Sequence, residues 1–139
     1  MKRIFYQSKA AKVLLFFSSC STIAIGPFVL SKLSESEMPQ YVRNHECTHS
    51  RQWIETTVAS GFLLFLLVAL AGINAWWMMP SAFVFYLWYG VEWMVRLCLL
   101  RNGKKAYRAV SFEQEAYANE RNMNYAENAG YFSWVKYFL

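Results

Sequence analysis

The sequence predicts an all-α integral membrane protein built on a hairpin of two transmembrane helices. Three observations lead to this fold class. Between Val58 and Leu100 the only charged side chains are Glu92 and Arg96, which is typical of membrane spans and not of a soluble core. Basic residues lie on both outer flanks of this apolar block, and one proline, Pro80, divides it into two stretches of helical length. With 139 residues, the chain has room for a single domain, 1–139.

Residues 1–33 are expected to form an N-terminal apolar segment in or on the membrane. The basic start MKRIFYQSKAAK and the following VLLFFSSCSTIAIG resemble the opening of a secretory signal peptide. Between residues 21 and 32, β-branched residues surround Gly26-Pro27, which fits either a short strand or the kinked end of a helix. As a strand, residues 28–32 would offer an edge to the backbone of a substrate.

Residues 39–57 are predicted to form a helix that continues into the membrane. Pro39 is tolerated in a first helical turn, and no further proline follows until Pro80. Residues 58–79 make the first span, because 22 residues at about 1.5 Å each cross a hydrocarbon core of about 30 Å. Residues 81–100 make the second span.

The charge distribution predicts how this hairpin is oriented. Its connector carries no charge, whereas Arg43 and Arg51 precede it and Lys104 and Lys105 follow it. Positive residues mark the cytoplasmic side, so both ends of the hairpin are expected at the cytoplasmic face of a bacterial inner membrane. The chain has no dense Lys/Arg run and no aromatic-glycine signature, which excludes nucleic acid as a partner.

Two further features lie within and after the second span. Glu92 and Arg96 are four residues apart, so they can pair with each other, or they can serve a functional site. After a polar turn, residues 105–127 are predicted to form one more helix, which is rich in carboxylates. The C-terminal YFSWVKYFL has the composition of an interfacial anchor.

The segment HECTH, residues 45–49, has the pattern HExxH and holds the only two histidines of the chain. Residues four apart share one helix face, so His45 and His49 can bind one tetrahedral Zn²⁺. Glu46 lies on the flank of that face, where it can hold a water molecule and accept its proton. Two ligands are too few for zinc, and the carboxylates of residues 111–120 are candidates for the third. The sequence therefore predicts a zinc site between two helices beside the membrane.

With these motifs the chain resembles the gluzincin metallopeptidases, especially the membrane-embedded CAAX prenyl protease, HtpX and antibiotic-sensor types. In the first of these types, a helix after HExxH carries Glu, two residues, Ala and then Asp, and the Glu is the third zinc ligand. Glu113 matches that ligand, with Tyr117 where the family has Asp. A shifted alignment makes Glu115 the ligand and places Asn119 at the Asp position. Only one of the two glutamates fits the face that meets the histidines, and we prefer Glu113.

The chain is also similar to small bacterial membrane proteins with the same HExxH, Trp/Tyr-rich span and SFExEAYANE order. The resemblance implies a fold and a zinc site and does not name a substrate. With the gluzincin motifs, we expect zinc-dependent hydrolysis of a peptide bond in a membrane-associated protein or peptide, with Glu46 as the base and membrane lipid around the hairpin. Arg51, Tyr107, Tyr117 and Tyr125 are candidate donors to the oxyanion that forms on the attacked carbonyl.

The alternative function is a non-catalytic membrane subunit. Its helices would bind zinc structurally, or bind no metal, and its hairpin would dock a larger membrane protein. The short chain favours this alternative, because little of it is left to shape a substrate cleft. The intact Glu46 favours the enzyme, because a structural site has no need of a base.

Overall fold

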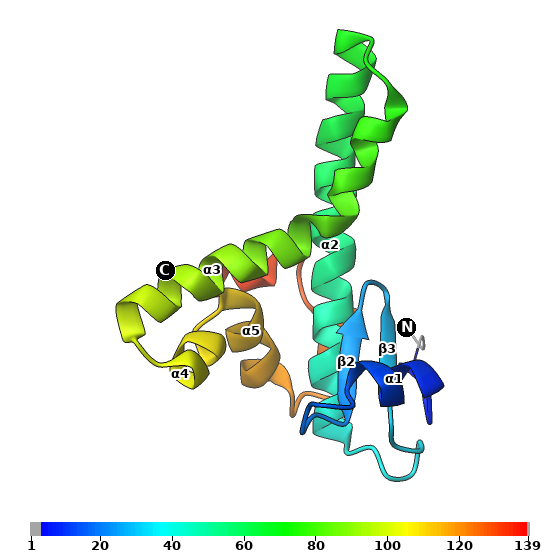
Figure 1. Ribbon diagram of the computed structural model, residues 1–139, viewed down its shortest axis with the longest axis vertical. Coiled ribbons are helices and arrows are strands. Elements are labelled where there is room, and N and C mark those ends of the chain that lie inside the picture. The colour runs from blue at the N-terminus through cyan, green and yellow to red at the C-terminus, as the bar shows by residue number, and fades with distance from the viewer. Residues whose placement is uncertain (1–3, 139) are drawn as a thin grey trace.

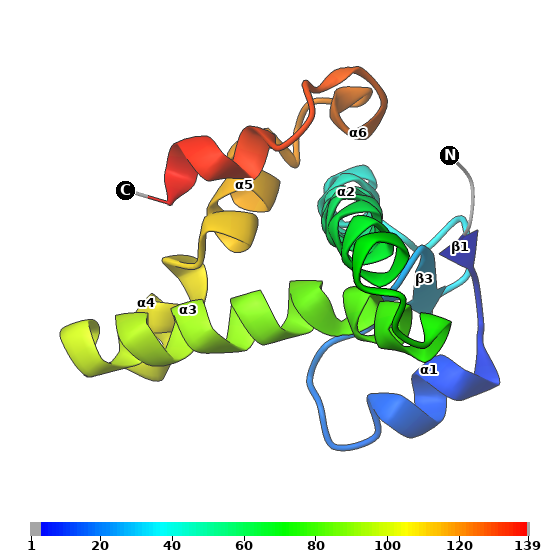
Figure 2. The same cartoon turned by 90° about the horizontal axis from the view of Figure 1, so that it is seen from above.

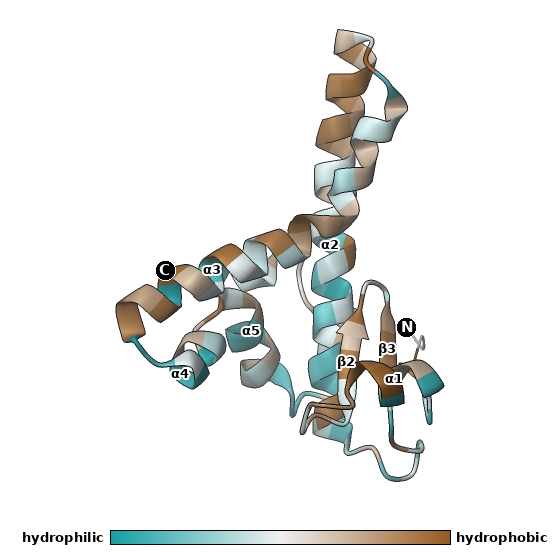
Figure 3. Ribbon diagram, viewed as in Figure 1, coloured by the Kyte–Doolittle hydropathy of each residue, from teal (hydrophilic) through white to brown (hydrophobic). Residues whose placement is uncertain are grey.

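The chain is mostly helical and is arranged around one long helix, α2 (Gln40–Ala71), as the computed structural model of residues 4–138 shows (Figure 1). Residues 1–3 of the predicted N-terminal segment and residue 139 of the predicted anchor lie outside the described residues. Along α2 the side chains change from polar in the first half to apolar in the second (Figure 3). The helical fold class is confirmed, and two helical stretches, Gln40–Ala71 and Ala75–Leu100, are long and apolar enough to cross a membrane.

Of the strand and the helix end left open for residues 21–32, the structure shows the strand, which belongs to a small sheet within the otherwise helical chain. β1 (Ile4–Phe5), α1 (Lys9–Leu14), β2 (Thr22–Ile25) and β3 (Phe28–Ser31) follow one another, with strand order β1-β3-β2. Gly26, with a φ of 57°, makes the turn between the antiparallel strands β2 and β3.

This strand order decides which strand has a free edge. The proposal of an edge strand at residues 28–32 is wrong, because β3 is the central strand and is paired on both sides. The edge strand nearest to α2 is β2, which packs against that helix. Figure 2 shows α2 between the sheet on one side and α5 on the other.

α2 ends earlier than the predicted first span, 58–79. Gly72 takes the left-handed conformation, with a φ of 62°, and this ends the helix at Ala71. Asn74 then caps the 3₁₀ segment η1 (Ala75–Phe83), accepting a hydrogen bond from the Trp76 N–H at 2.9 Å. η1 packs along the end of α2, so residues 58–83 form a narrow projection, called the stalk below.

The predicted second span, 81–100, is not one straight helix that runs antiparallel to the first. α3 (Val84–Leu100) leaves the base of the stalk at a steep angle to α2 (Figure 1). Its first turn is held in the core, where the ring of Phe85 lies 4.7 Å from that of Phe112. Phe112 in turn packs against Trp134 of the 3₁₀ segment η2 (Ser133–Tyr137). These buried aromatic contacts direct α3 away from the stalk.

The predicted helix 105–127 is divided into three: α4 (Gly103–Arg108), α5 (Ser111–Asn119) and α6 (Tyr125–Asn128). The break before α5 is stabilised from outside the segment. The Glu92 carboxylate on α3 accepts hydrogen bonds from the Ser111 N–H at 2.9 Å and the Ser111 hydroxyl at 2.7 Å. It therefore acts as a helix cap supplied by another helix. Glu92 also pairs with Arg96 at 3.4 Å, so mutual pairing is the observed arrangement of these two residues.

We expect Glu92→Ala to destabilise the protein, because it leaves the Ser111 N–H and hydroxyl without an acceptor in a buried position. The free energy of unfolding should fall by about 1–3 kcal/mol. Thermal unfolding of the detergent-solubilised protein, followed by circular dichroism, measures this as a lower midpoint. Arg96→Ala is the control, since it removes the ion pair and leaves the cap; an equal midpoint for Glu92→Ala and wild type would contradict the capping role.

Candidate metal centre

Helices α2 and α5 pack together and bring three potential metal ligands to one point. His49 Nε2 lies 3.1 Å from His45 Nε2 and 3.0 Å from Glu113 Oε1, and His45 Nε2 lies 3.4 Å from Glu113 Oε2. Ligand atoms about 2.0–2.1 Å from a tetrahedral zinc ion are separated by about 3.3–3.4 Å. The three side chains therefore form a group that could hold a metal ion, at close to the spacing that zinc requires.

Glu113 has the properties of an anionic ligand. Its side chain is only 2% exposed, and Oε1 accepts a hydrogen bond from the Tyr89 hydroxyl at 3.0 Å. Oε2 is buried and has no hydrogen-bond partner among the described residues. Burial alone would raise the pKa of Glu113, but the close contacts and charge of His45 and His49 hold it well below its usual value. A buried anionic oxygen without a donor fits a metal ion, so the residues present suit zinc.

His49 is oriented by a hydrogen-bond network behind it. Its Nδ1 lies 2.8 Å from Gln52 Oε1, while Gln52 Nε2 donates to the Phe112 carbonyl at 3.0 Å and to Glu115 Oε2 at 2.7 Å. These acceptors fix the Gln52 amide, so His49 donates from Nδ1 to Gln52 Oε1, and its Nε2 faces the centre as the atom that would bind a metal ion. Sequence reasoning missed Gln52, although its position one turn after His49 on the same helix face was a usable signal.

Glu115 belongs to this network and not to the group of ligands. Its Oε1 accepts a hydrogen bond from the Tyr125 hydroxyl at 2.8 Å, and its Oε2 accepts from Gln52. Burial and the hydrogen bond to Glu115 raise the pKa of Tyr125 to about 12, so this hydroxyl stays protonated. Of the two glutamates left open by the sequence, the structure places Glu113 beside the histidines and Glu115 behind His49.

Glu46 lies on the flank of the ligand face and is half-buried. Its Oε1 accepts a hydrogen bond from the Thr22 hydroxyl of β2 at 3.1 Å, and its negative charge acts on His49. β2 pairs with β3 on one side, and no other described strand pairs with its outer edge. The carboxylate thus joins the ligand-bearing part of α2 to β2, an edge strand of the described sheet. Sequence reasoning missed Thr22, for which no motif gave a signal.

Two of the predicted donors lie close to the centre. The Tyr117 ring packs against the His45 ring at 4.6 Å. Tyr107 interacts with Glu113, and burial together with the negative charge of that carboxylate raises the pKa of Tyr107. The position of Tyr89 next to Glu113 was not foreseen, because an aromatic residue in an apolar span gives no sign of a polar contact.

Two other predicted residues lie elsewhere. Asn119 donates to the Glu115 carbonyl one turn back in its own helix, at 2.8 Å. Arg51 pairs with Glu55 at 2.7 Å and donates to the Gly130 carbonyl. Asn119 thus bonds within α5, while Arg51 also lies 4.0 Å from Glu115 Oε1, at the edge of the network behind His49. Comparisons of the chain with models of protein families, with curated proteins and with solved structures find no match.

Proposed function

We propose that this chain is a zinc-dependent metallopeptidase that hydrolyses peptide bonds in membrane-associated proteins or peptides. The observation that carries the proposal is the convergence of His45, His49 and Glu113, with Glu46 on their flank. Structural zinc sites are closed by four protein ligands, whereas catalytic sites use three and keep one position open. The described residues supply three ligands to this group, which favours catalysis over a structural role.

The side chains around the centre have the properties that peptide hydrolysis needs. Zinc held by the three ligands would polarise the peptide carbonyl and lower the pKa of a water molecule. In the proposed mechanism, Glu46 accepts the proton of the attacking water and gives it to the departing nitrogen. Burial raises the pKa of both Tyr117 and Tyr107, so each keeps its proton and is a candidate donor to the oxyanion.

Two features support a membrane-associated substrate. α2 joins the ligands to the apolar stalk without a break, so the centre would lie beside the membrane, at the cytoplasmic face that the basic flanks indicate. The outer edge of β2, next to Glu46, would let an extended peptide add as a further strand and present its backbone to the centre.

Removing the metal is expected to abolish hydrolysis. The full chain in detergent micelles would be given internally quenched peptides that carry an acyl anchor, and cleavage would be followed by fluorescence and mass spectrometry. The chelator 1,10-phenanthroline should lower the rate at least about 100-fold, because the carbonyl and the water both lose their activation. Added Zn²⁺ should restore the rate, and the non-chelating 1,7-isomer should leave it unchanged.

The same preparation separates the enzyme from the alternative of a non-catalytic membrane subunit. Zinc-loaded protein that cleaves no peptide and co-purifies with a stoichiometric membrane partner would overturn the peptidase proposal and support that alternative. A rate that is insensitive to 1,10-phenanthroline would show that the cleavage does not depend on this centre.

A further inference from the structure

One side of α3 is apolar and exposed along the length of the helix. Four of its large side chains are between 48% and 68% exposed: Leu87, Val91, Met94 and Val95. At about 100° per residue, these four positions lie within about 100° of one another, so they share one side of the helix. Cys98, which is also exposed, continues this side toward the end of α3. We call this side the apolar face of α3.

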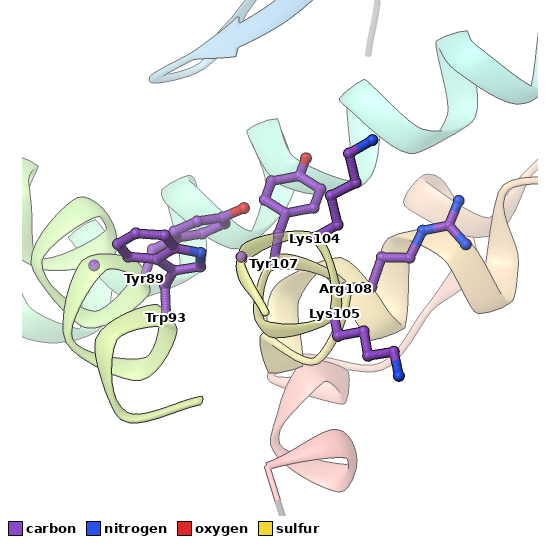
Figure 4. Close-up of a pocket in the computed structure, with 8 residues that line it drawn as sticks. Tyr89, Trp93, Lys104, Lys105, Tyr107 and Arg108 are labelled. Carbon is purple, nitrogen blue, oxygen red and sulfur yellow. The ribbon is translucent and has the colours of Figure 1, made fainter. Parts of the chain in front are cut away.

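The opposite face of α3 is bound to the rest of the chain. Glu92 caps α5 as described above, and Arg96 donates a hydrogen bond to the Phe138 carbonyl at 2.9 Å. The Tyr89 and Trp93 rings lie on the side of α3 that faces α4, where they line a pocket of about 730 Å³ (Figure 4). α3 is therefore joined to α4, α5 and the C-terminal segment.

These attachments are incompatible with α3 as a membrane span. A span is surrounded by lipid or by other spans, and charged side chains at that depth are costly. If α3 crossed the bilayer, α4 would enter the hydrocarbon with it, together with the exposed cations Lys104, Lys105 and Arg108. By length and composition α3 and the preceding η1 could cross, but as folded α3 is amphipathic.

The apolar face of α3 is turned to the side from which the stalk projects. In Figure 1 the stalk rises above α3, whereas α4 and α5 lie below it. Figure 2, which views the molecule from the tip of the stalk, shows α3 in front of α4. The stalk is itself apolar and exposed, as in Phe62 at 60%, Leu70 at 87% and Trp76 at 72%. The stalk and the apolar face of α3 thus form two apolar surfaces that meet at a steep angle.

Aromatic side chains with bonded polar atoms lie where these two surfaces meet. The Trp53 indole N–H donates to the Ala82 carbonyl at 2.9 Å, and the Tyr86 hydroxyl accepts a hydrogen bond from the Gly26 N–H at 2.7 Å. Tryptophan and tyrosine are enriched at the boundary between membrane and water. The base of the stalk, where α3 leaves it, therefore has the composition of a membrane interface.

We propose that the apolar face of α3 lies in the surface of a lipid bilayer, with the helix axis parallel to the membrane plane, while the stalk inserts along the membrane normal. A bilayer matches both surfaces, because its hydrocarbon accepts the stalk in depth and an amphipathic helix at its boundary. Between residues 58 and 112 the only acidic side chain, Glu92, is buried, whereas Arg101 and Lys104 are exposed. This charge distribution favours a surface of anionic lipid.

This position of α3 determines how the metal centre is reached. Tyr89, on the bound face of α3, donates a hydrogen bond to Glu113, so α3 would lie between the centre and the lipid. A peptide would then reach the centre from the aqueous side, after leaving the bilayer. The position of α3 does not depend on the metal, so it is expected for an enzyme and for a non-catalytic subunit alike.

The depth of nitroxide spin labels in bilayers of phosphatidylcholine and phosphatidylglycerol tests this position. The full chain, with its other native cysteines replaced by alanine, would carry one label at Leu87→Cys, at Val91→Cys or at the native Cys98. Accessibility to oxygen, compared with accessibility to a water-soluble nickel complex, measures the depth of each label. We expect all three at equal depth, about 5–10 Å into the boundary between headgroups and acyl chains. In a spanning helix, the labels at 87 and 98 would differ in depth by about 16 Å.

Two further labels give the reference depths. Leu70→Cys in the stalk should lie deeper than all three labels on α3, and Glu35→Cys, in the exposed segment before α2, should be fully accessible to the nickel complex. A depth that changes steadily from 87 to 98 would overturn the proposal in favour of a span. Nickel accessibility of Leu87→Cys equal to that of Glu35→Cys would also overturn it, because the face would then lie in water.

The same spectra detect a second copy of the chain on the apolar face. Dipolar broadening that disappears on dilution with unlabelled protein would show that another copy covers this face in place of lipid, and would overturn the proposal as well. Zinc content and peptide cleavage do not enter these measurements, so the proposal for α3 can fail without affecting the proposed function.

Discussion

Glu113→Gln is expected to abolish stoichiometric zinc binding, while Glu115→Gln leaves one zinc ion per chain. The two residues make a matched pair, because both are buried carboxylates on α5 and receive the same nearly isosteric change. At position 113 the change replaces an anionic ligand by a neutral amide, which is a poor ligand for zinc. At position 115 it alters only the network behind His49, where such changes typically lower metal affinity about 10–100-fold.

Zinc per chain, determined by elemental analysis after dialysis in detergent, measures the first effect, and competition with a chromophoric chelator measures the second. His49→Ala should behave like Glu113→Gln. Loss of zinc with Glu115→Gln and its retention with Glu113→Gln would show that the other glutamate is the ligand. A wild-type protein that takes up no zinc, even when it is added back, would remove the basis for the metal centre.

Glu46→Gln is expected to lower the rate of peptide hydrolysis by about 10²–10⁴-fold, because the variant has no group to accept the proton of the attacking water. Zinc content should stay at the wild-type level, since Glu46 is not one of the three ligands. The Thr22 hydroxyl can still hydrogen-bond the amide oxygen, so the local fold is expected to persist. Cleavage of acyl-anchored peptides and elemental analysis on the same sample separate these two effects.

Glu35→Gln is a suitable control, because Glu35 is exposed and contacts Arg43 away from the centre. It should cleave at the wild-type rate. A fully active Glu46→Gln protein would rule out Glu46 as the base and would require another proton acceptor. Loss of zinc in this variant would mean that Glu46 also helps to hold the metal.

The helical spacing of HExxH was enough to predict that His45 and His49 share one face, because α2 is regular and contains no break between them. The third ligand was harder to predict, because Glu113 and Glu115 are both compatible with a helix. Their difference depends on how α5 rotates against α2, and Gln52 and Tyr89 define that rotation through bonds to Glu115 and Glu113. Such contacts between distant segments leave no periodic signal in a sequence.

The differences between the predicted and the observed helices and strands also arise from contacts and conformations that leave no periodic signal in the sequence. The helix predicted at 105–127 divides because a carboxylate 19 residues before Ser111 caps α5. The short strands of residues 4–31 lie in an apolar segment, and apolar runs of this length fit a strand as well as a helix. The end of α2 at Ala71 depends on the left-handed conformation of Gly72, while a hydropathy pattern continues past it. Local pattern predicted the presence of helices, and long-range contacts and single glycines determined where they end.

The uninterrupted course of α2 has a consequence for where a substrate would be cut. From His49 to Val58, where the stalk begins, the helix rises about 13 Å, and a helix of this kind neither stretches nor bends easily. An extended peptide covers that distance in about four residues. Because α2 would fix this distance, different substrates would be cut at the same distance from the bilayer, a few residues outside it. The cleavage point would then depend on its distance from the lipid more than on the amino acids at the cut.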